Sequence, residues 1–100
     1  MADKITPSTG NVFEDLGFPK EEAENLRVRS ALMATIRAII DEEGLTQARA
    51  AKIFGVTQPR ISDLVRGKIE LFSIDALVNM LAASGRHVDI SIGAPQDEAA

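Results

Sequence analysis

The sequence contains no cysteine, no tryptophan and no tyrosine, and its one histidine is His87. The lack of cysteine excludes disulfide bonds, thiolate zinc sites and cysteine nucleophiles. A single histidine leaves the chain few means of general acid–base catalysis, and no phosphate-binding loop or serine nucleophile motif compensates for it. We therefore expect a protein without enzymatic activity, metal or cofactor, in which His87 is a solvated surface residue.

Long apolar runs are also missing. No stretch approaches the roughly 20 residues that a transmembrane helix needs, and the first residues lack the basic and apolar parts of a signal peptide. We expect a soluble, cytoplasmic protein that makes no contact with a membrane. The 100 residues, 45% of them hydrophobic, suffice for one folded domain with a modest core. This domain is expected over residues 11–93, between a flexible N-terminal arm (1–10) and a flexible tail (94–100).

Basic charge is scarce, and it is concentrated in one segment. The formal net charge of -4, taken alone, argues against a polyanionic partner. Residues 44–68, however, contain five basic side chains and one acidic side chain, whereas residues 1–43 contain five and nine. The central segment therefore has the positive charge that binding to DNA phosphates requires, although a solvated helix face would have the same composition.

Apolar spacing and capping residues predict helices over most of the chain. A long helix is expected from Pro19 to Glu43, because proline and early acidic residues favour a helix start and Gly44 provides an end. Three shorter helices are expected after Thr46, Thr57 and Ser73, whose side-chain oxygens can cap a helix N-terminus. Each of these helices has apolar residues at helical spacing, so each is expected to bury one face.

One strand is expected near the end of the chain, over Arg86 to Gly93. Val88, Ile90 and Ile92 alternate there with polar residues, which is typical of a half-buried strand. A lone strand leaves the backbone groups of both its edges unpaired. We expect it to pair with the same strand of a second copy, so that these three residues form a homodimer contact. Pairing with Asn11 to Phe13 of the same chain is the alternative.

The centre of the chain contains short motifs at fixed offsets. Within them, Gly55 supplies the positive φ that a tight turn needs, and the small Ala51 lets two helices cross closely. The motifs resemble the helix-turn-helix of the XRE or Cro/repressor type, over roughly residues 31–85. This resemblance implies an all-α, lambda-repressor-like bundle of about five helices, to which the alternating pattern adds the short C-terminal β-strand. In chain order the motifs are Leu45-Thr46-Gln47, Ala50-Ala51, Gly55-Val56-Thr57-Gln58, Ile61-Ser62-Asp63-Leu64 and Arg66-Gly67-Lys68.

The same resemblance implies which residues contact double-stranded DNA. The helix from Gln58 to Arg66 would enter the major groove with Gln58, Pro59 and Asp63 facing base edges, and with Arg60 within reach of a base or a phosphate. A glutamine amide can pair with adenine, a carboxylate can accept from cytosine, and proline can contact the thymine methyl group. Pro59 departs from the polar residue that often occupies its place, and its side chain has no group that could hydrogen-bond a base. The remaining members of the expected DNA-contacting set, which hold the sugar-phosphate backbone or start the helix, are Thr46, Gln47, Thr57, Ser62, Arg66 and Lys68.

The wider layout resembles the compact HigA-like antitoxins of type II toxin–antitoxin pairs, because an apolar segment, Asn11 to Phe18, precedes the domain and a strand follows it. The resemblance implies an antitoxin that represses its own operon and binds a toxin ribonuclease, through its acidic surface or through Val12 to Phe18. A homodimer would present two recognition helices about 34 Å apart and so predicts an inverted-repeat operator. A stand-alone XRE-family repressor without a toxin is the alternative, and a helical interaction module that binds no DNA is the second.

Overall fold

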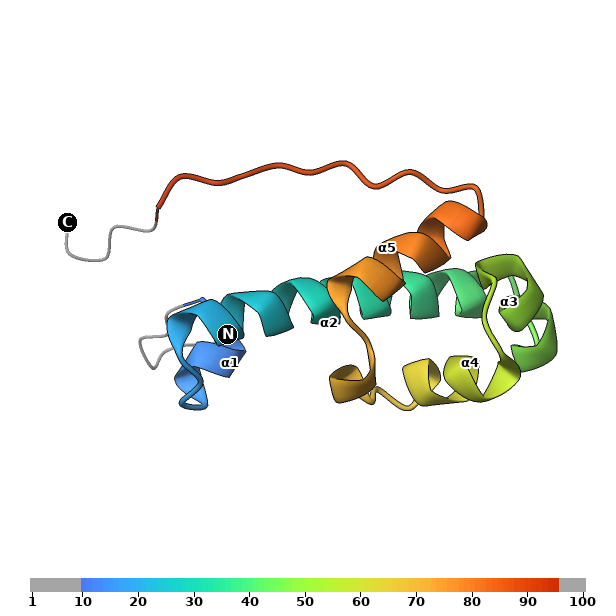
Figure 1. The fold of residues 1–100 in the computed structure, drawn as a ribbon, viewed down its shortest axis with the longest axis horizontal. Coiled ribbons are helices and arrows are strands. Elements are labelled where there is room, and N and C mark those ends of the chain that lie inside the picture. Colours follow the sequence, from blue (N-terminus) through green and yellow to red (C-terminus); the bar gives the residue numbers. More distant parts are fainter. Residues whose placement is uncertain (1–9, 96–100) are drawn as a thin grey trace.

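A computed structural model of the chain describes residues 10–95. The predicted arm (1–10) and tail (94–100) lie mostly outside these residues. Within them the chain forms five α-helices and one short 3-10 helix, arranged as in Figure 1. Their bounds are α1 (Val12–Asp15), α2 (Lys20–Glu42), α3 (Gln47–Phe54), α4 (Gln58–Val65), η1 (Ile69–Leu71) and α5 (Ile74–Ala83).

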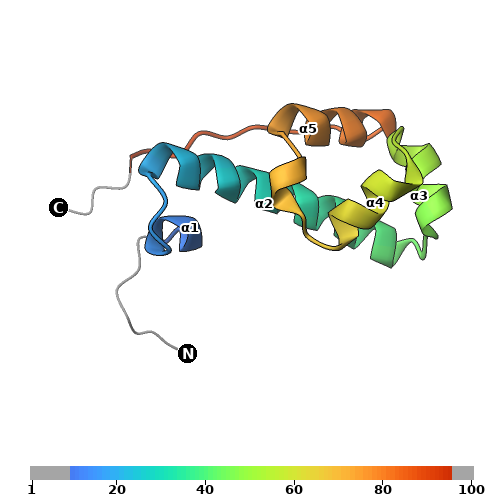
Figure 2. The same cartoon turned by 60° about the horizontal axis from the view of Figure 1, so that its bottom comes forward.

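The long helix α2 is the element on which most of the others pack. Helix α5 lies along it, α4 lies against its C-terminal half, and α1 lies at its N-terminal end (Figures 1 and 2). Helix α3 packs on α4 and α5. One hydrophobic core is formed by residues of α2, α3, α4 and α5 together with Phe72, which follows η1. Burial of each large side chain in this core stabilises the fold by about 1.5–3 kcal/mol. The residues of this core are Met33, Ile36, Ile40, Ala50, Ala51, Phe54, Ile61, Leu64, Phe72, Leu77, Met80 and Leu81.

The predicted helix caps are confirmed. The Thr46 hydroxyl oxygen accepts a hydrogen bond from the backbone N–H of Arg49 at 3.1 Å, and Ser73 does the same for the N–H of Ala76 at 3.1 Å. These bonds satisfy N–H groups that the first helical turn leaves without an intrahelical partner. Local sequence chemistry therefore sets where α3 and α5 begin.

The apolar N-terminal segment docks only in part. Asn11 caps α1, and its side-chain amide donates a hydrogen bond to the Ala23 carbonyl oxygen of α2 at 3.2 Å. The ring of Phe13 meets that of Phe18 edge to face, with 6.3 Å between the centroids. Leu16, in contrast, is 70% exposed. The segment thus anchors one side on α2 and presents apolar side chains on the other.

The predicted C-terminal strand is wrong, since none of the residues between 10 and 95 forms a strand. After Gly85 the chain runs back over α5 and α2 without regular structure (Figure 1). The alternation of side chains has the period of a strand, but a strand also needs a neighbour for its backbone hydrogen bonds, and the described chain is otherwise helical. The intramolecular alternative is wrong too, because Asn11 to Phe13 caps and begins α1.

Candidate nucleic-acid interface

The helix-turn-helix unit consists of α3, the turn 55–57 and α4. Gly55 ends α3 in the left-handed conformation at φ 71°, and the N–H of Val56 donates back to the Ala51 carbonyl oxygen at 3.0 Å. Ile61 and Leu64 of α4 are 0% and 1% exposed, so they hold the inner side of this helix in the core. The rotation of α4 about its own axis is therefore determined by packing.

The outer side of α4 and its C-cap contain five of the ten predicted DNA-contacting residues. Gln58, Pro59 and Arg66 are exposed, while Ser62 and Asp63 are half-buried. Gln58, Ser62 and Arg66 follow one another at intervals of four residues, so they lie on one face of the helix and its C-cap. The structure brings these predicted residues together on the side of α4 that faces away from the core.

The starts of α3 and α4 add further predicted residues to this region. Thr46, Gln47 and Thr57 are all exposed. The Thr57 hydroxyl oxygen accepts from the backbone N–H of Arg60 at 3.4 Å, which identifies it as the N-cap of α4. Arg49 and Lys52 are exposed as well and contribute positive charge on α3.

Two of the predicted residues, Asp63 and Lys68, lie beside each other. The Lys68 ammonium is 4.0 Å from the Asp63 carboxylate, with the two side chains 39% and 27% exposed. The backbone N–H of Lys68 also donates to the Asp63 carbonyl oxygen at 3.1 Å. Lys68 therefore stays close to the end of α4, although it follows the helix.

Arg60 differs from the other predicted residues because its guanidinium contacts the protein itself. The side chain is half-buried, its Nη1 donates to the Leu71 carbonyl oxygen at 3.0 Å, and its Cζ lies 4.2 Å from the centroid of the Phe72 ring. Sequence reasoning placed Arg60 in the DNA-contacting set but missed its contact with the segment that follows α4.

A second arginine that sequence reasoning missed holds the same segment from α2. Arg29 of α2 donates through Nη1 to the carbonyl oxygens of Ile69 and Phe72, at 3.2 and 3.3 Å. Its Nε donates to the Asn25 side-chain oxygen at 2.7 Å, which orients the guanidinium. The carbonyl groups of Ile69 and Phe72 are 40 and 43 residues from Arg29 in sequence, so no local pattern could have identified these two contacts.

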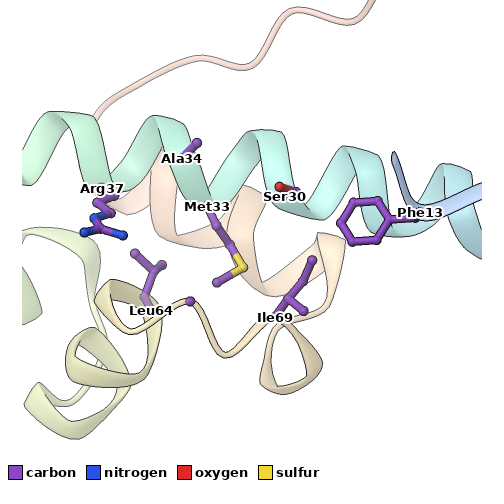
Figure 3. Close-up of a pocket in the computed structure, with 8 residues that line it drawn as sticks. Phe13, Ser30, Met33, Ala34, Arg37, Leu64 and Ile69 are labelled. Atoms are coloured by element: carbon purple, nitrogen blue, oxygen red, sulfur yellow. The ribbon is translucent and has the colours of Figure 1, made fainter. Parts of the chain in front are cut away.

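A pocket of about 360 Å³ lies between α2 and the end of α4. Met33, Leu64 and Ile69 converge in it, with Arg37 and Phe13 toward its two ends (Figure 3). Its lining is mostly apolar. It is separate from the exposed face of α4 that includes Gln58.

The expected dimer residues differ in exposure. Val88 packs partly against the core, whereas Ile90 and Ile92 are 81% and 87% exposed. The exposed His87 lies 3.1 Å from the equally exposed Asp89. Over residues 10–95 no group of three or more potential metal ligands occurs, and none of the helices there is long and apolar enough to cross a membrane.

Comparison with known proteins identifies the family. A helix-turn-helix domain family matches residues 12–93. No curated protein matches the sequence. One solved structure, of a candidate XRE family transcriptional regulator, shares 34% sequence identity, covers 77% of this chain and 86% of its own, and superimposes with a TM-score of 0.68. The chain belongs to this helix-turn-helix domain family, and its helix-turn-helix is of the XRE type.

Proposed function

We propose that this protein is a sequence-specific transcriptional regulator that inserts α4 into the major groove of double-stranded DNA. The observation that carries the proposal is the division of α4 into two sides. Ile61 and Leu64 anchor one side in the core, and Gln58 and Pro59 are exposed at the start of the other. The major groove admits an α-helix, and a glutamine amide there can pair with both polar atoms of adenine.

In this proposal Gln58, Pro59 and Asp63 face base edges. The residues around them hold the sugar-phosphate backbone, which fixes the register of the protein on the duplex but reads little sequence. Residues 44–68 have an excess of four positive charges, which supports binding of phosphates by this part of an otherwise acidic chain. The residues proposed to hold the sugar-phosphate backbone are Thr46, Gln47, Ser62, Arg66 and Lys68, and Thr57, which caps α4, completes the proposed DNA-binding set.

We further propose a homodimer that binds an inverted-repeat operator. Two copies related by a two-fold axis place their recognition helices about 34 Å apart, which is one turn of B-DNA. Val88, Ile90 and Ile92 are the proposed dimer contacts. The high exposure of the two isoleucines supports this assignment, because burying them against a second copy removes apolar surface from water.

The regulator is proposed to be the antitoxin of a HigBA-like pair, which represses its own operon and binds a toxin ribonuclease in the cytoplasm. The favouring observation is the exposed apolar surface of the N-terminal segment, where Val12 and Leu16 are 61% and 70% exposed. Acidic side chains such as Glu21 and Glu22 are exposed at the start of the adjacent α2. An apolar patch with acidic neighbours suits a basic protein partner and lies away from α4, so DNA and toxin would use different surfaces.

A salt titration tests the DNA-binding proposal against the alternative of a helical interaction module. The full-length protein is titrated with duplexes selected from a random library, at several salt concentrations. Neutralising phosphates releases counterions, so the affinity is expected to fall steeply as salt rises. No binding to DNA, or an affinity that does not change with salt, would favour the interaction module, and binding without a preferred sequence would contradict sequence-specific regulation.

Co-expression with the neighbouring small reading frame distinguishes the antitoxin from a stand-alone repressor. The antitoxin proposal expects that the neighbour arrests growth when expressed alone and that this protein relieves the arrest by forming a complex with it. If the neighbour has no effect on growth and does not copurify with this protein, the stand-alone repressor remains.

A further inference from the structure

The turn 69–72, which contains η1 and connects α4 to α5, is held by two arginines. Arg29 of α2 donates to the carbonyl oxygens of Ile69 and Phe72, and Arg60 of α4 donates to that of Leu71. Three of the four carbonyl groups in the turn therefore accept hydrogen bonds from guanidinium groups on two different helices. Arg60 ties the far end of the turn to α4 through a side chain, whereas Arg29 ties the turn to α2.

The Arg60 guanidinium is engaged by two contacts that act together. Its hydrogen bond to Leu71 is 3.0 Å long, and its Cζ lies 4.2 Å above the ring of Phe72, which is 1% exposed. A planar guanidinium can stack on a ring and donate in its own plane at the same time. To reach a base edge, the side chain would have to give up both contacts.

The turn is also connected to Lys68, one of the proposed phosphate contacts. Lys68 immediately precedes η1, and its carbonyl oxygen accepts from the N–H of Leu71 at 3.0 Å. Leu71 therefore connects the two residues, because its carbonyl oxygen accepts from Arg60 and its N–H donates to Lys68. At the other end, Lys68 is tied to α4 by the bond from its own N–H to Asp63.

We propose that Arg60 is a positioning residue, which holds the turn 69–72 against α4 and through it aims Lys68 at a DNA phosphate, and that it makes no base contact. The proposal rests on the proposed DNA-binding function. It assigns to Arg60 a role different from that of Gln58 and Pro59, which precede it on the same helix and are exposed.

The first test needs no DNA. Amide hydrogen exchange is measured on the full-length protein and on the variants Arg60→Lys and Arg60→Met, with Arg49→Met, which changes an exposed arginine of α3, as the matched control. Both Arg60 variants are expected to speed exchange at the amides of Leu71 and Phe72 by about tenfold, because lysine cannot stack and donate as the guanidinium does. The control should leave these amides unchanged. Unchanged exchange in the Arg60 variants would overturn the proposal.

The second test measures binding to a duplex selected from a random library and to a random-sequence duplex of the same length. A positioning role predicts that both Arg60 variants lose about tenfold in affinity for either duplex and keep the wild-type base preference. When Lys68 is already replaced by alanine, the Arg60 substitutions should cause no further loss of affinity. A changed preference at one base position, or an additive loss with Lys68→Ala, would overturn it. If the wild-type protein binds neither duplex, the proposed function fails, and the exchange experiment still decides whether Arg60 holds the turn.

Discussion

Gly55 lies so close to Ala83 that it leaves little room for a side chain. A Cβ atom at position 55 would be 3.3 Å from the Ala83 Cβ, closer than ordinary van der Waals contact. The end of α3 thereby packs directly against the end of α5. This approach sets the position of the helix-turn-helix relative to the helix that follows it.

Substitution of Gly55 by alanine should therefore lower the free energy of unfolding more than the same substitution at a glycine that has a similar φ but free space around it. Gly67 is the matched control, since its φ is 75° against 71° for Gly55 and a Cβ atom added there would meet no other atom within 4 Å. Gly67→Ala is expected to lower the free energy of unfolding by about 1–2 kcal/mol, the cost of a left-handed alanine. Gly55→Ala should lose more, because Ala83 must also move. Urea denaturation measures both, and equal losses would contradict the close contact.

The helices could be predicted from the sequence because their signals are local. The capping oxygens of Thr46, Thr57 and Ser73 lie a few residues from the N–H groups that they accept from. Gly55 has the predicted left-handed conformation, for which glycine has no Cβ penalty. The resemblance to the XRE-type helix-turn-helix, confirmed by the comparisons, rests on local motifs that include Thr46, Gly55 and Thr57.

The features that sequence reasoning missed depend on distant partners. Phe72 lies between the two helices expected after Thr57 and Ser73 and belongs to none of the motifs, yet it is 1% exposed and lies under the Arg60 guanidinium. Arg29 lies in the acidic half of the chain, and its bond to Ile69 spans 40 residues. The alternation around Ile90 has the period of a strand but says nothing of a pairing neighbour, and in the structure Ile90 and Ile92 are both exposed.

The ion pair of Glu24 and Arg27 gives a prediction about pH. The Arg27 guanidinium donates to both Glu24 carboxylate oxygens, at 2.9 and 2.6 Å, and these hydrogen bonds lower the pKa of Glu24 below its ordinary 4.5. Arg27→Gln should raise this pKa toward 4.5, whereas Arg37→Gln, on the same helix, should not. Carboxyl carbon NMR titration measures the pKa, and an unchanged value in Arg27→Gln would contradict the assigned cause.

The same pair contributes a small pH-dependent stabilisation, whose sign follows from the lowered pKa. Because the folded state binds the Glu24 proton more weakly than the unfolded state, the contribution is complete above pH 4.5 and is lost as pH falls through the lower folded value. The side chains of Arg27 and Glu24 are 50% and 59% exposed, so solvent screens the attraction between their charges. The stability difference between wild type and Arg27→Gln should therefore be small near pH 7 and vanish in acid.

Oligomeric state tests the proposed dimer contacts. The double substitution Ile90→Lys and Ile92→Lys should shift the protein toward monomer, because it places two charges where apolar side chains would be buried against the second copy. Leu16→Lys is the matched control, since Leu16 is also highly exposed but lies in the segment proposed to bind a toxin. Sedimentation velocity over a range of concentrations measures the effect. A dimer that survives the double substitution would place the interface elsewhere.

Alanine substitutions of Gln58 and Lys68 should differ in their effect on binding to selected and random DNA, because Gln58 is proposed to read a base and Lys68 to hold a phosphate. Gln58→Ala is expected to cost about 1–3 kcal/mol of binding free energy on the selected duplex and little on random DNA. Lys68→Ala should weaken binding to both duplexes similarly and reduce the salt dependence by about one charge. Fluorescence anisotropy with both duplexes at several salt concentrations provides the comparison. If Gln58→Ala weakened both duplexes equally, Gln58 would have no role in reading sequence.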